Sequence, residues 1–416
     1  MRKPLRVAIT ARAVYPLHGL GGLERSVFDL ARHLTREGAS VTLITRTPKT
    51  KADANAIDPR VSLVFVPYRT FPLAGRRGTT ILDRSTAYPR FGARAGALAA
   101  QLVSRGEIDI VHGFGASVLG YASRRAQLPA PLVLNPQGLE EFGATDPSRA
   151  RLKRVAYLPL RRAVLRCAAA ADAVIATDRA LEPGVREHLR VPAERIATIP
   201  NALDLEYLDV LAGAADAARV RTSAQLESKD VVLLSVGRVE QNKGFHVLAQ
   251  ALAGLREHSG RLAHGRWRWV IVGEGPFLGR LRAFVTDLGL TKDVVFAGRL
   301  PDRELHAWYE AADLFVHPSL YEGSSLVTLE AMAHRRACVV TDAGGLRDKV
   351  HNDLNGWIVA PGDPAALAAA ISGALEDPAR RRQMGDAGRI IVERQFSWTS
   401  AARATVALYE RLLQRA

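Results

Sequence analysis

The chain has 416 residues, of which 48% are hydrophobic and 24% charged, a composition typical of globular proteins and long enough for two or three domains. Its net charge of +15 lies in the first half: residues 1–200 hold 31 Lys and Arg against 16 Asp and Glu, whereas residues 201–416 hold 26 of each. This asymmetry indicates an anionic partner, such as nucleic acid, a membrane surface or an anionic acceptor. No apolar run approaches the ~20 residues of a membrane-spanning helix, and the N-terminal MRKPLRVAIT carries too few apolar residues for a signal peptide.

Short apolar runs alternate with helical patterns along the whole chain. In the first half the predicted strands are RVAIT (6–10), SVTLIT (40–45), VSLVFVP (61–67), DIVH (109–112), PLVLN (131–135) and AVIAT (173–177). In the second half they are VVLLSVG (231–237), WVIVG (269–273), VVFAG (294–298), LFVHP (314–318), CVVTD (338–342) and GWIVA (356–360). This alternation predicts an α/β protein with two doubly wound parallel sheets.

The domain boundary is expected near IPNALDLEY, residues 199–207, followed by an Ala-rich stretch without a clear pattern to about Lys229. Ligands of open parallel sheets bind beyond the carboxyl ends of the strands. Two such domains facing each other would therefore form one ligand-binding cleft.

The segment HPSLYEGSSLVTLEAM, residues 317–332, places two glutamates around an apolar run. Residues 314–316 predict a buried strand, and the apolar spacing after residue 325 predicts a helix capped by Ser324 or Ser325. Glu322 then lies in the loop before the helix, and Glu330 lies about two turns inside it. Because a helix N-terminus attracts phosphate, the two acids are candidates to bind hydroxyl groups flanking a phosphate. Taken alone, each acid also fits an ordinary solvated residue.

Further ligand-binding signals follow other predicted strands. Arg238 and Lys243 come after the strand that begins the second half, and two cations at a helix start suit a diphosphate. IVGEGP, residues 271–276, offers small residues against which a flat group can lie, although its glycine spacing differs from a dinucleotide fingerprint. Gly21 and Gly22, after the first strand, allow close approach of a ligand to the backbone, or form an ordinary turn.

Five motifs in chain order resemble the family 4 retaining glycosyltransferases: GGLER, GRVEQNKGF, GEGP, FAGRLPDREL and the paired glutamates of HPSLYEGSSLVTLEAMA. The resemblance implies the GT-B fold of two facing Rossmann-like domains. It implies an N-terminal acceptor-binding domain (1–200), a C-terminal nucleotide-sugar-binding domain (201–396) and a final helix (397–416) that crosses back to the first domain. The implied reaction is transfer of a sugar, with retained configuration, from a UDP- or GDP-linked donor. The acceptor would be a glycan or a lipid-linked molecule of cell-envelope polysaccharide or glycolipid synthesis.

The resemblance also assigns roles to individual residues. Arg238 and Lys243 would hold the donor diphosphate, Glu322 would accept hydrogen bonds from the transferred sugar, and Glu330 would accept them from the ribose. The residues expected to line the donor site are Gly21, Gly22, Arg238, Lys243, Gly273, Glu274, Gly323, Ser324, Ser325, Leu326 and Glu330.

The catalytic candidates are His112, Glu322, Arg238 and Lys243. His112 stands where family members often carry an H-x-H motif, but Phe114 occupies the second position. Two further departures concern the shape of the site: Ser324-Ser325 replaces an aromatic-Gly pair, and Ala202 replaces the glycine of a PNG turn.

Cofactor and compartment are predicted from what the sequence lacks. It contains no Asp-x-Asp motif and no metal-ligand spacing, so we expect Arg238, Lys243 and helix N–H groups, rather than a metal or other cofactor, to stabilise the leaving diphosphate. Cys167 and Cys338 lie far apart and predict buried thiols in a reducing cytoplasm.

Three other functions remain open. A nucleotide-sugar 2-epimerase would have the same two-domain plan but would need more acid and base groups. A non-catalytic scaffold of this fold is a second possibility. A basic nucleic-acid-binding protein would explain the charge, but the sequence shows no helix-turn-helix, zinc or RNP signature; HGRWRWV, residues 264–270, is better explained as the edge of a core strand.

The segment RARLKRVAYLPLRRAVLRC, residues 149–167, interleaves cations with apolar residues. It predicts two short helices interrupted at Pro159. These would either pack on the core or lie on the anionic inner face of the cell membrane, making the protein cytoplasmic and peripheral. The cations expected at this membrane or acceptor surface are Arg151, Lys153, Arg154, Arg161 and Arg162.

Overall fold

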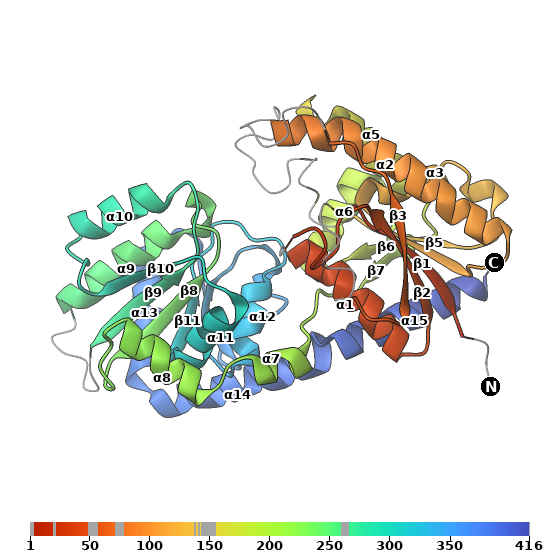
Figure 1. The fold of residues 1–416 in the computed structure, drawn as a ribbon. Coiled ribbons are helices and arrows are strands. Elements are labelled where there is room, and N and C mark those ends of the chain that lie inside the picture. Colours follow the sequence, from red (N-terminus) through yellow and green to blue (C-terminus); the bar gives the residue numbers. More distant parts are fainter. Residues whose placement is uncertain are drawn as a thin grey trace. The chain divides into compact units, whose positions relative to one another are not determined.

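The chain folds into two compact units in a computed structural model (Figure 1). The structure describes residues 4–19, 22–48, 57–70, 79–136, 139, 142, 155–258 and 266–415. Unit 1 consists of Met1–Asn201 with Trp398–Ala416, and unit 2 consists of Ala202–Ser397.

Unit 1 is built on a parallel sheet that has seven strands among the described residues, in the order β3-β2-β1-β4-β5-β6-β7. The strands are β1 Arg6–Thr10, β2 Ser40–Arg46, β3 Val61–Val66, β4 Ile110–Phe114, β5 Leu132–Asn135, β6 Ala173–Ala176 and β7 Ile196–Thr198. The chain runs outward from β1 to β3 on one side and from β4 to β7 on the other, so the order reverses between β1 and β4. Ligands of doubly wound sheets bind at such a reversal, beyond the carboxyl ends of the strands.

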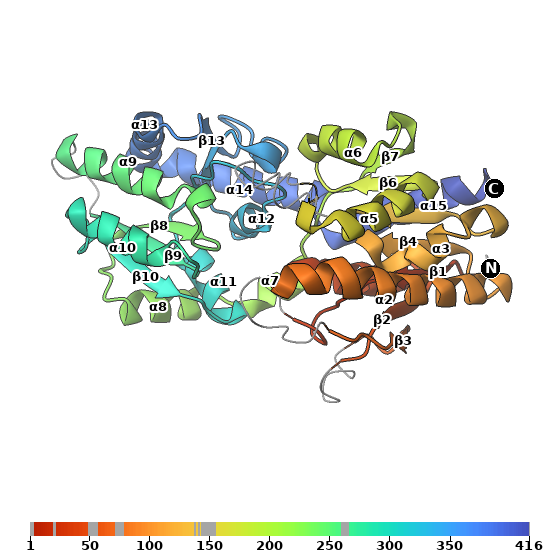
Figure 2. The same ribbon diagram turned by 90° about the horizontal axis from the view of Figure 1, so that it is seen from above.

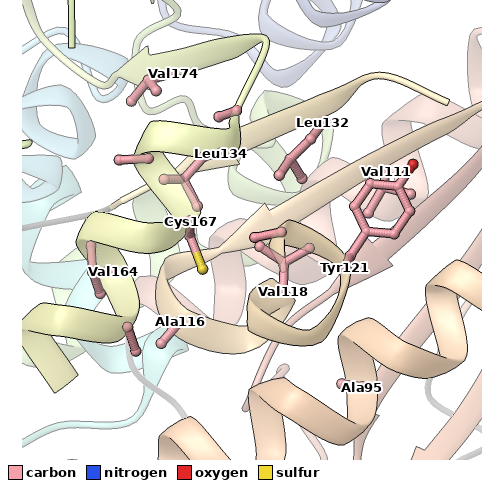
Figure 3. Close-up of a cluster of buried hydrophobic side chains, with 14 of the residues drawn as sticks. Ala95, Val111, Ala116, Val118, Tyr121, Leu132, Leu134, Val164, Cys167 and Val174 are labelled. Carbon is pink, nitrogen blue, oxygen red and sulfur yellow. The ribbon is translucent and has the colours of Figure 1, made fainter. Parts of the chain in front are cut away.

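Helices cover both faces of this sheet. One face packs against α2 Thr79–Ser104, α3 Leu119–Ala122, α5 Leu158–Ala170 and α6 Glu182–Leu189. Figure 3 shows this cluster, in which Cys167 of α5 lies among apolar side chains from β4, β5 and β6. The other face carries α1 Gly22–Arg36 and the final helix α15 Trp398–Leu413, which pack against each other.

Unit 2 contains a parallel sheet that has, among the described residues, six strands in the order β10-β9-β8-β11-β12-β13. The strands are β8 Val231–Val236, β9 Trp267–Val272, β10 Val294–Gly298, β11 Leu314–His317, β12 Cys338–Thr341 and β13 Gly356–Val359. The order again reverses, here between β8 and β11. The loops after these two strands therefore occupy the usual ligand-binding edge of the sheet.

Helices lie on both sides of this sheet (Figure 2), and they enclose a hydrophobic cluster against each of its faces. One is formed with α9 Phe245–His258, α10 Leu278–Asp287 and α13 Pro364–Glu376. The other is formed with α7 Leu205–Leu211, α8 Ala214–Ser223, α11 Asp302–Ala311, α12 Leu326–Ala333 and α14 Pro378–Gln395. Neighbouring residues of β8 enter opposite clusters, Leu233 the first and Leu234 the second. Burial on both faces explains why the predicted strands are continuous apolar runs.

The predicted fold class is confirmed in that both units are Rossmann-like α/β domains with parallel sheets, and each of the twelve predicted strands is present. Two details were wrong. β7 was missed, because it has three residues and none of them is fully buried. The stretch expected to lack a pattern before Lys229 forms α7 and α8. The predicted interruption near Pro159 is present: residues 155 and 156 are helical, residue 157 is a turn, and α5 begins at Leu158 with Pro159 in its first turn, where its missing N–H costs nothing.

Candidate functional site

Three loops at the carboxyl edge of the unit 2 sheet are held in close contact by glycines. Gly244, after β8, has φ +67°, and a Cβ there would come within 1.9 Å of the Pro318 carbonyl oxygen in the loop after β11. Gly344, after β12, has φ +53°, and its Cβ would lie 1.8 Å from the Glu322 carbonyl oxygen. Both the left-handed backbone and the lack of space require glycine at these positions. The loop that carries Glu322 is therefore fixed from two sides.

The Glu322 side chain gathers three donors on one oxygen. Its Oε2 lies 2.7 Å from Lys243 Nζ, 2.6 Å from His317 Nε2 and 3.1 Å from Ser319 Oγ. Lys243 belongs to the loop after β8, and His317 is the last residue of β11. No hydrogen bond to Oε1 is formed by the residues that the structure describes. One carboxylate oxygen thus holds the loops together, and the other remains available to a ligand.

Glu322 is ionised although its side chain is only 9% exposed. Burial by itself raises the pKa of this carboxyl, but the hydrogen bond from His317 and the charge of Lys243 outweigh burial and hold the pKa of Glu322 well below its usual range. Burial lowers the pKa of His317, so its ring is neutral at pH 7 and donates from Nε2. Its Nδ1 has no hydrogen-bond partner among the described residues. The buried charge of Glu322 is therefore balanced by Lys243.

The second acid, Glu330, lies on α12, five residues after the N-cap residue Ser325. The helix start agrees with the prediction, because Ser325 stands at the N-cap position. Glu330 Oε2 accepts a hydrogen bond of 2.8 Å from the Tyr309 hydroxyl. The Ser325 side chain does not cap the helix and instead bonds to Thr328 Oγ1 at 2.9 Å. The backbone N–H groups at this helix start are therefore not capped by Ser325, as an anion site requires.

Other predicted donor residues lie in loops of the same edge. Arg238 is 70% exposed and forms an ion pair of 3.2 Å with Glu240. Gly273 has φ +139°, and a Cβ there would lie 1.9 Å from the Gly237 carbonyl oxygen, which locks the loop after β9 onto the loop after β8. The neighbouring Glu274 is exposed.

Of the remaining predicted donor-site residues, all except one lie in the described parts of the chain. Gly323 and Ser324 precede α12, and Leu326 is its first residue. A Cβ on Gly323 would meet open space. In unit 1, Gly22 begins α1, whereas Gly21 lies outside the described residues.

His112 lies in the middle of β4 in unit 1, where only 1% of it is exposed. Its Nδ1 hydrogen bonds to the Tyr409 hydroxyl of α15 at 2.6 Å, and burial lowers the pKa of His112 to about 3. Nε2 has no partner among the described residues, and the ring borders a cavity of about 20 Å³, enough for one water molecule. This environment favours a structural role that ties α15 to the sheet, so catalysis by His112 stays a prediction.

The predicted membrane or acceptor surface is only partly described. Arg151, Lys153 and Arg154 lie outside the described residues. Arg162 of α5 is exposed, whereas Arg161 is half-buried with its guanidinium 5.2 Å from the centre of the Phe142 ring. Among the described helices, none is long and apolar enough to cross a membrane.

Comparison with known proteins identifies the family. Residues 20–207 match glycosyltransferase family 4, and residues 216–390 match the glycosyl transferases group 1. A D-inositol 3-phosphate glycosyltransferase of Catenulispora acidiphila is 30% identical over 412 residues, covering 95% of this chain and 91% of the relative. The chain belongs to glycosyltransferase family 4.

Solved structures show the same fold for this family 4 glycosyltransferase. Sucrose-phosphate synthase from Thermosynechococcus elongatus has a TM-score of 0.77 at 24% identity, covering 99% of this chain and 100% of that one. Anabaena Alr3699/HepE in complex with UDP has a TM-score of 0.70 at 19% identity, covering 98% and 100%. The GT-B class predicted from the sequence is confirmed, and glycosyl transfer is favoured over epimerisation and nucleic-acid binding.

Several residues of this glycosyltransferase site were not anticipated from the sequence. His317 and Ser319 hold Glu322, Gly344 fixes its loop, and Tyr309 contacts Glu330. The signal for His317 was present, because a polar residue that ends a buried strand lies at the ligand-binding edge of the sheet. Tyr309 gave no such signal, because it occurs in an amphipathic helix among ordinary core residues.

Proposed function

We propose that this glycosyltransferase transfers a sugar from a nucleoside-diphosphate donor, bound by unit 2, to a glycan or lipid-linked acceptor bound by unit 1, with retention of the anomeric configuration. The observation that carries the proposal is the Lys243–Glu322 pair at the carboxyl edge of the unit 2 sheet, beside the start of α12. It combines a cation for phosphate, a carboxylate for sugar hydroxyls and a helix N-terminus. Solved structures of similar proteins contain UDP, UDP-glucose or ADP, which supports a nucleotide-linked donor.

Different charged side chains bind the donor and stabilise the leaving group. Lys243 and Arg238 neutralise the diphosphate as the bond between the sugar C1 and the phosphate oxygen breaks. Glu322 uses Oε1 to accept a hydrogen bond from a sugar hydroxyl, while its Oε2 stays tied to the protein. Glu330 accepts hydrogen bonds from the ribose hydroxyls. The site thereby holds the donor at three points around its reacting carbon.

Retention is best explained by attack from the face that the diphosphate leaves. The acceptor oxygen bonds to C1, and its proton passes to the departing phosphate oxygen. Glu322 is poorly suited to be a nucleophile or a base, because its pKa is held well below the usual range and Lys243 is bound to it. The front-face route requires neither role.

The test is a transfer assay with radiolabelled UDP-, GDP- and ADP-sugars, each with and without candidate acceptors. We expect one donor to support acceptor-dependent transfer, and NMR of the product to show the donor's anomeric configuration. Inversion would contradict the front-face route, and epimerised free donor without transfer would favour the epimerase.

Activity should persist in excess EDTA, because Lys243 and Arg238 supply the positive charge that a divalent ion would otherwise provide. The expected rate in EDTA is within about twofold of the untreated rate. Among the described residues, no group of three or more His, Cys, Asp or Glu side chains is arranged to hold a metal ion. Loss of activity in EDTA that magnesium or manganese restores would refute metal independence.

We further propose that unit 1 binds the anionic inner face of the cell membrane through α5. One side of this helix packs on the core, and the other exposes Leu158 (40%), Arg162 and Arg166, next to Val155 (74%). Within α5, Leu158, Arg162 and Arg166 recur four positions apart and so share a face. Apolar residues that can enter the interface, beside cations that meet lipid phosphates at about 1 kcal/mol each, suit a peripheral membrane protein.

Liposome sedimentation tests the membrane proposal. We expect binding to vesicles with anionic lipid at low salt and much weaker binding at high salt, because the Debye length shrinks. Arg162→Gln with Arg166→Gln should reduce binding severalfold, whereas Arg280→Gln with Arg299→Gln, two exposed arginines of unit 2, serves as the charge-matched control. Equal binding to neutral and anionic vesicles, or none to either, would rule the proposal out.

A further inference from the structure

Tyr309 makes a direct contact with the second acid of the pair. It lies near the end of α11, and its hydroxyl donates a hydrogen bond of 2.8 Å to Glu330 Oε2. The same hydroxyl lies 3.2 Å from the Val327 carbonyl oxygen. Glu330 and Val327 both belong to α12. A buried hydroxyl of α11 therefore holds the Glu330 carboxylate of the neighbouring helix α12.

The Tyr309 ring is fixed on several sides. Tyr309 is fully buried, and its ring is stacked on His334 with centroids 5.7 Å apart and an interplanar angle of 7°. The ring of Phe315 on β11 is tilted against the Tyr309 ring, with the two ring centroids 5.9 Å apart. His334 is itself held by hydrogen bonds to Glu310 at 3.1 Å and to His306 at 2.9 Å. The hydroxyl is therefore presented to Glu330 from a rigid support rather than from a mobile side chain.

The direction of the hydrogen bond follows from chemistry. Burial, and then the charge of Glu330, raise the pKa of Tyr309 well above its usual value, so the hydroxyl keeps its proton and donates it. A carboxylate with one oxygen committed to a fixed donor has a defined plane and fewer orientations. Ribose carries two adjacent hydroxyls. Whether the carboxylate accepts hydrogen bonds from them in good geometry depends on the orientation of its plane.

We infer that Tyr309 is a positioning residue that orients Glu330 toward the ribose and so makes the enzyme prefer nucleotides with intact ribose hydroxyls. The inference rests on the proposed function, because it takes the ligand of Glu330 to be the ribose of a nucleoside-diphosphate sugar. Tyr309 itself touches no substrate.

The test compares affinities by calorimetry for whichever of UDP, GDP or ADP binds the wild-type protein, and for its 2′,3′-dideoxy analogue. Tyr309→Phe keeps the ring and removes only the hydroxyl. We expect this variant to weaken binding of the ribonucleotide about tenfold, because the ribose hydroxyls then lose a hydrogen bond to the charged Glu330. Binding of the dideoxy analogue, which lacks these hydroxyls, should weaken less than twofold. In the Glu330→Gln background, Tyr309→Phe should have little further effect.

Two variants guard against a purely structural effect. Tyr121→Phe removes a buried hydroxyl that donates to the Ala130 carbonyl in unit 1, and it should leave both affinities unchanged. Glu330→Asp withdraws the carboxylate from both Tyr309 and the ribose, so adding Tyr309→Phe to it should change neither affinity further, whereas a purely structural effect of the lost hydroxyl would still add. Equal weakening of both nucleotides by Tyr309→Phe, or no change in either, would overturn the inference. A wild-type protein that binds no nucleotide would remove the proposed function as well.

Discussion

Replacing Lys243 with alanine is expected to lower kcat/KM for the true donor by about 30- to 1000-fold, corresponding to about 2–4 kcal/mol of transition-state stabilisation. Lys243 is 19% exposed and lies 2.7 Å from Glu322, so the substitution removes the cation assigned to the diphosphate. It also leaves a buried carboxylate without its counter-charge, which repels an incoming diphosphate. Steady-state kinetics with the donor identified by the transfer assay would measure the change.

Lys229→Ala is the matched control for this variant. Lys229 is 69% exposed and pairs with Glu227 in the segment before β8. An exposed ion pair contributes little, so this control should keep wild-type kinetics. Unchanged turnover and KM in Lys243→Ala would remove Lys243 from the donor site.

Replacing Glu322 with glutamine should damage both activity and stability, because the amide has the same shape but cannot balance Lys243. We expect a loss of about 10²- to 10³-fold in kcat/KM and of about 3 kcal/mol in the free energy of unfolding at pH 7. The pKa of Glu322 is depressed in the folded protein, so its contribution is present above the unfolded pKa, about 4.3, and is lost as the pH falls below about 5. The stability gap between wild type and Glu322→Gln should therefore narrow from pH 7 to pH 3.

Urea unfolding followed by tryptophan fluorescence would measure this gap, because four of the five tryptophans belong to unit 2: Trp267, Trp269, Trp308 and Trp357. The double variant Lys243→Ala with Glu322→Gln should be more stable than the sum of the two single losses predicts, because neither charge is then left unpaired. A gap that stays constant with pH would contradict an ionised, buried Glu322.

The fold was largely predictable from the sequence, because buried parallel strands have a strong local signal. The run LFV at 314–316 is buried on both faces of its sheet, so all its residues are apolar, whatever element follows the strand. β7 lacks that signal, because its residues Ile196, Ala197 and Thr198 are partly exposed at the sheet edge. α8 was missed for a different reason: its Ala-rich segment buries only Ala217 and Val220, and so shows little amphipathic pattern.

The candidate site was predictable as a set of residues but not as an arrangement. Glu322 and Lys243 were singled out, yet their pairing joins loops 79 residues apart in the chain. Local sequence describes Glu322 as an ordinary loop acid, and only the contact with Lys243 and His317 explains how its charge is buried. Tyr309 shows the same limit, because its helical pattern predicts burial and does not predict its contact with Glu330.

The central claim is that the carboxyl edge of the unit 2 sheet binds a nucleoside diphosphate through its phosphates, with Lys243 as a principal contact. The most direct measurement is calorimetric titration of wild-type protein and Lys243→Ala with UDP, GDP, ADP and the three parent nucleosides. We predict that at least one diphosphate binds the wild type, that its nucleoside binds at least tenfold more weakly, and that Lys243→Ala removes most of this difference. Binding of no diphosphate, or equal binding of diphosphate and nucleoside by the wild type, would contradict the claim.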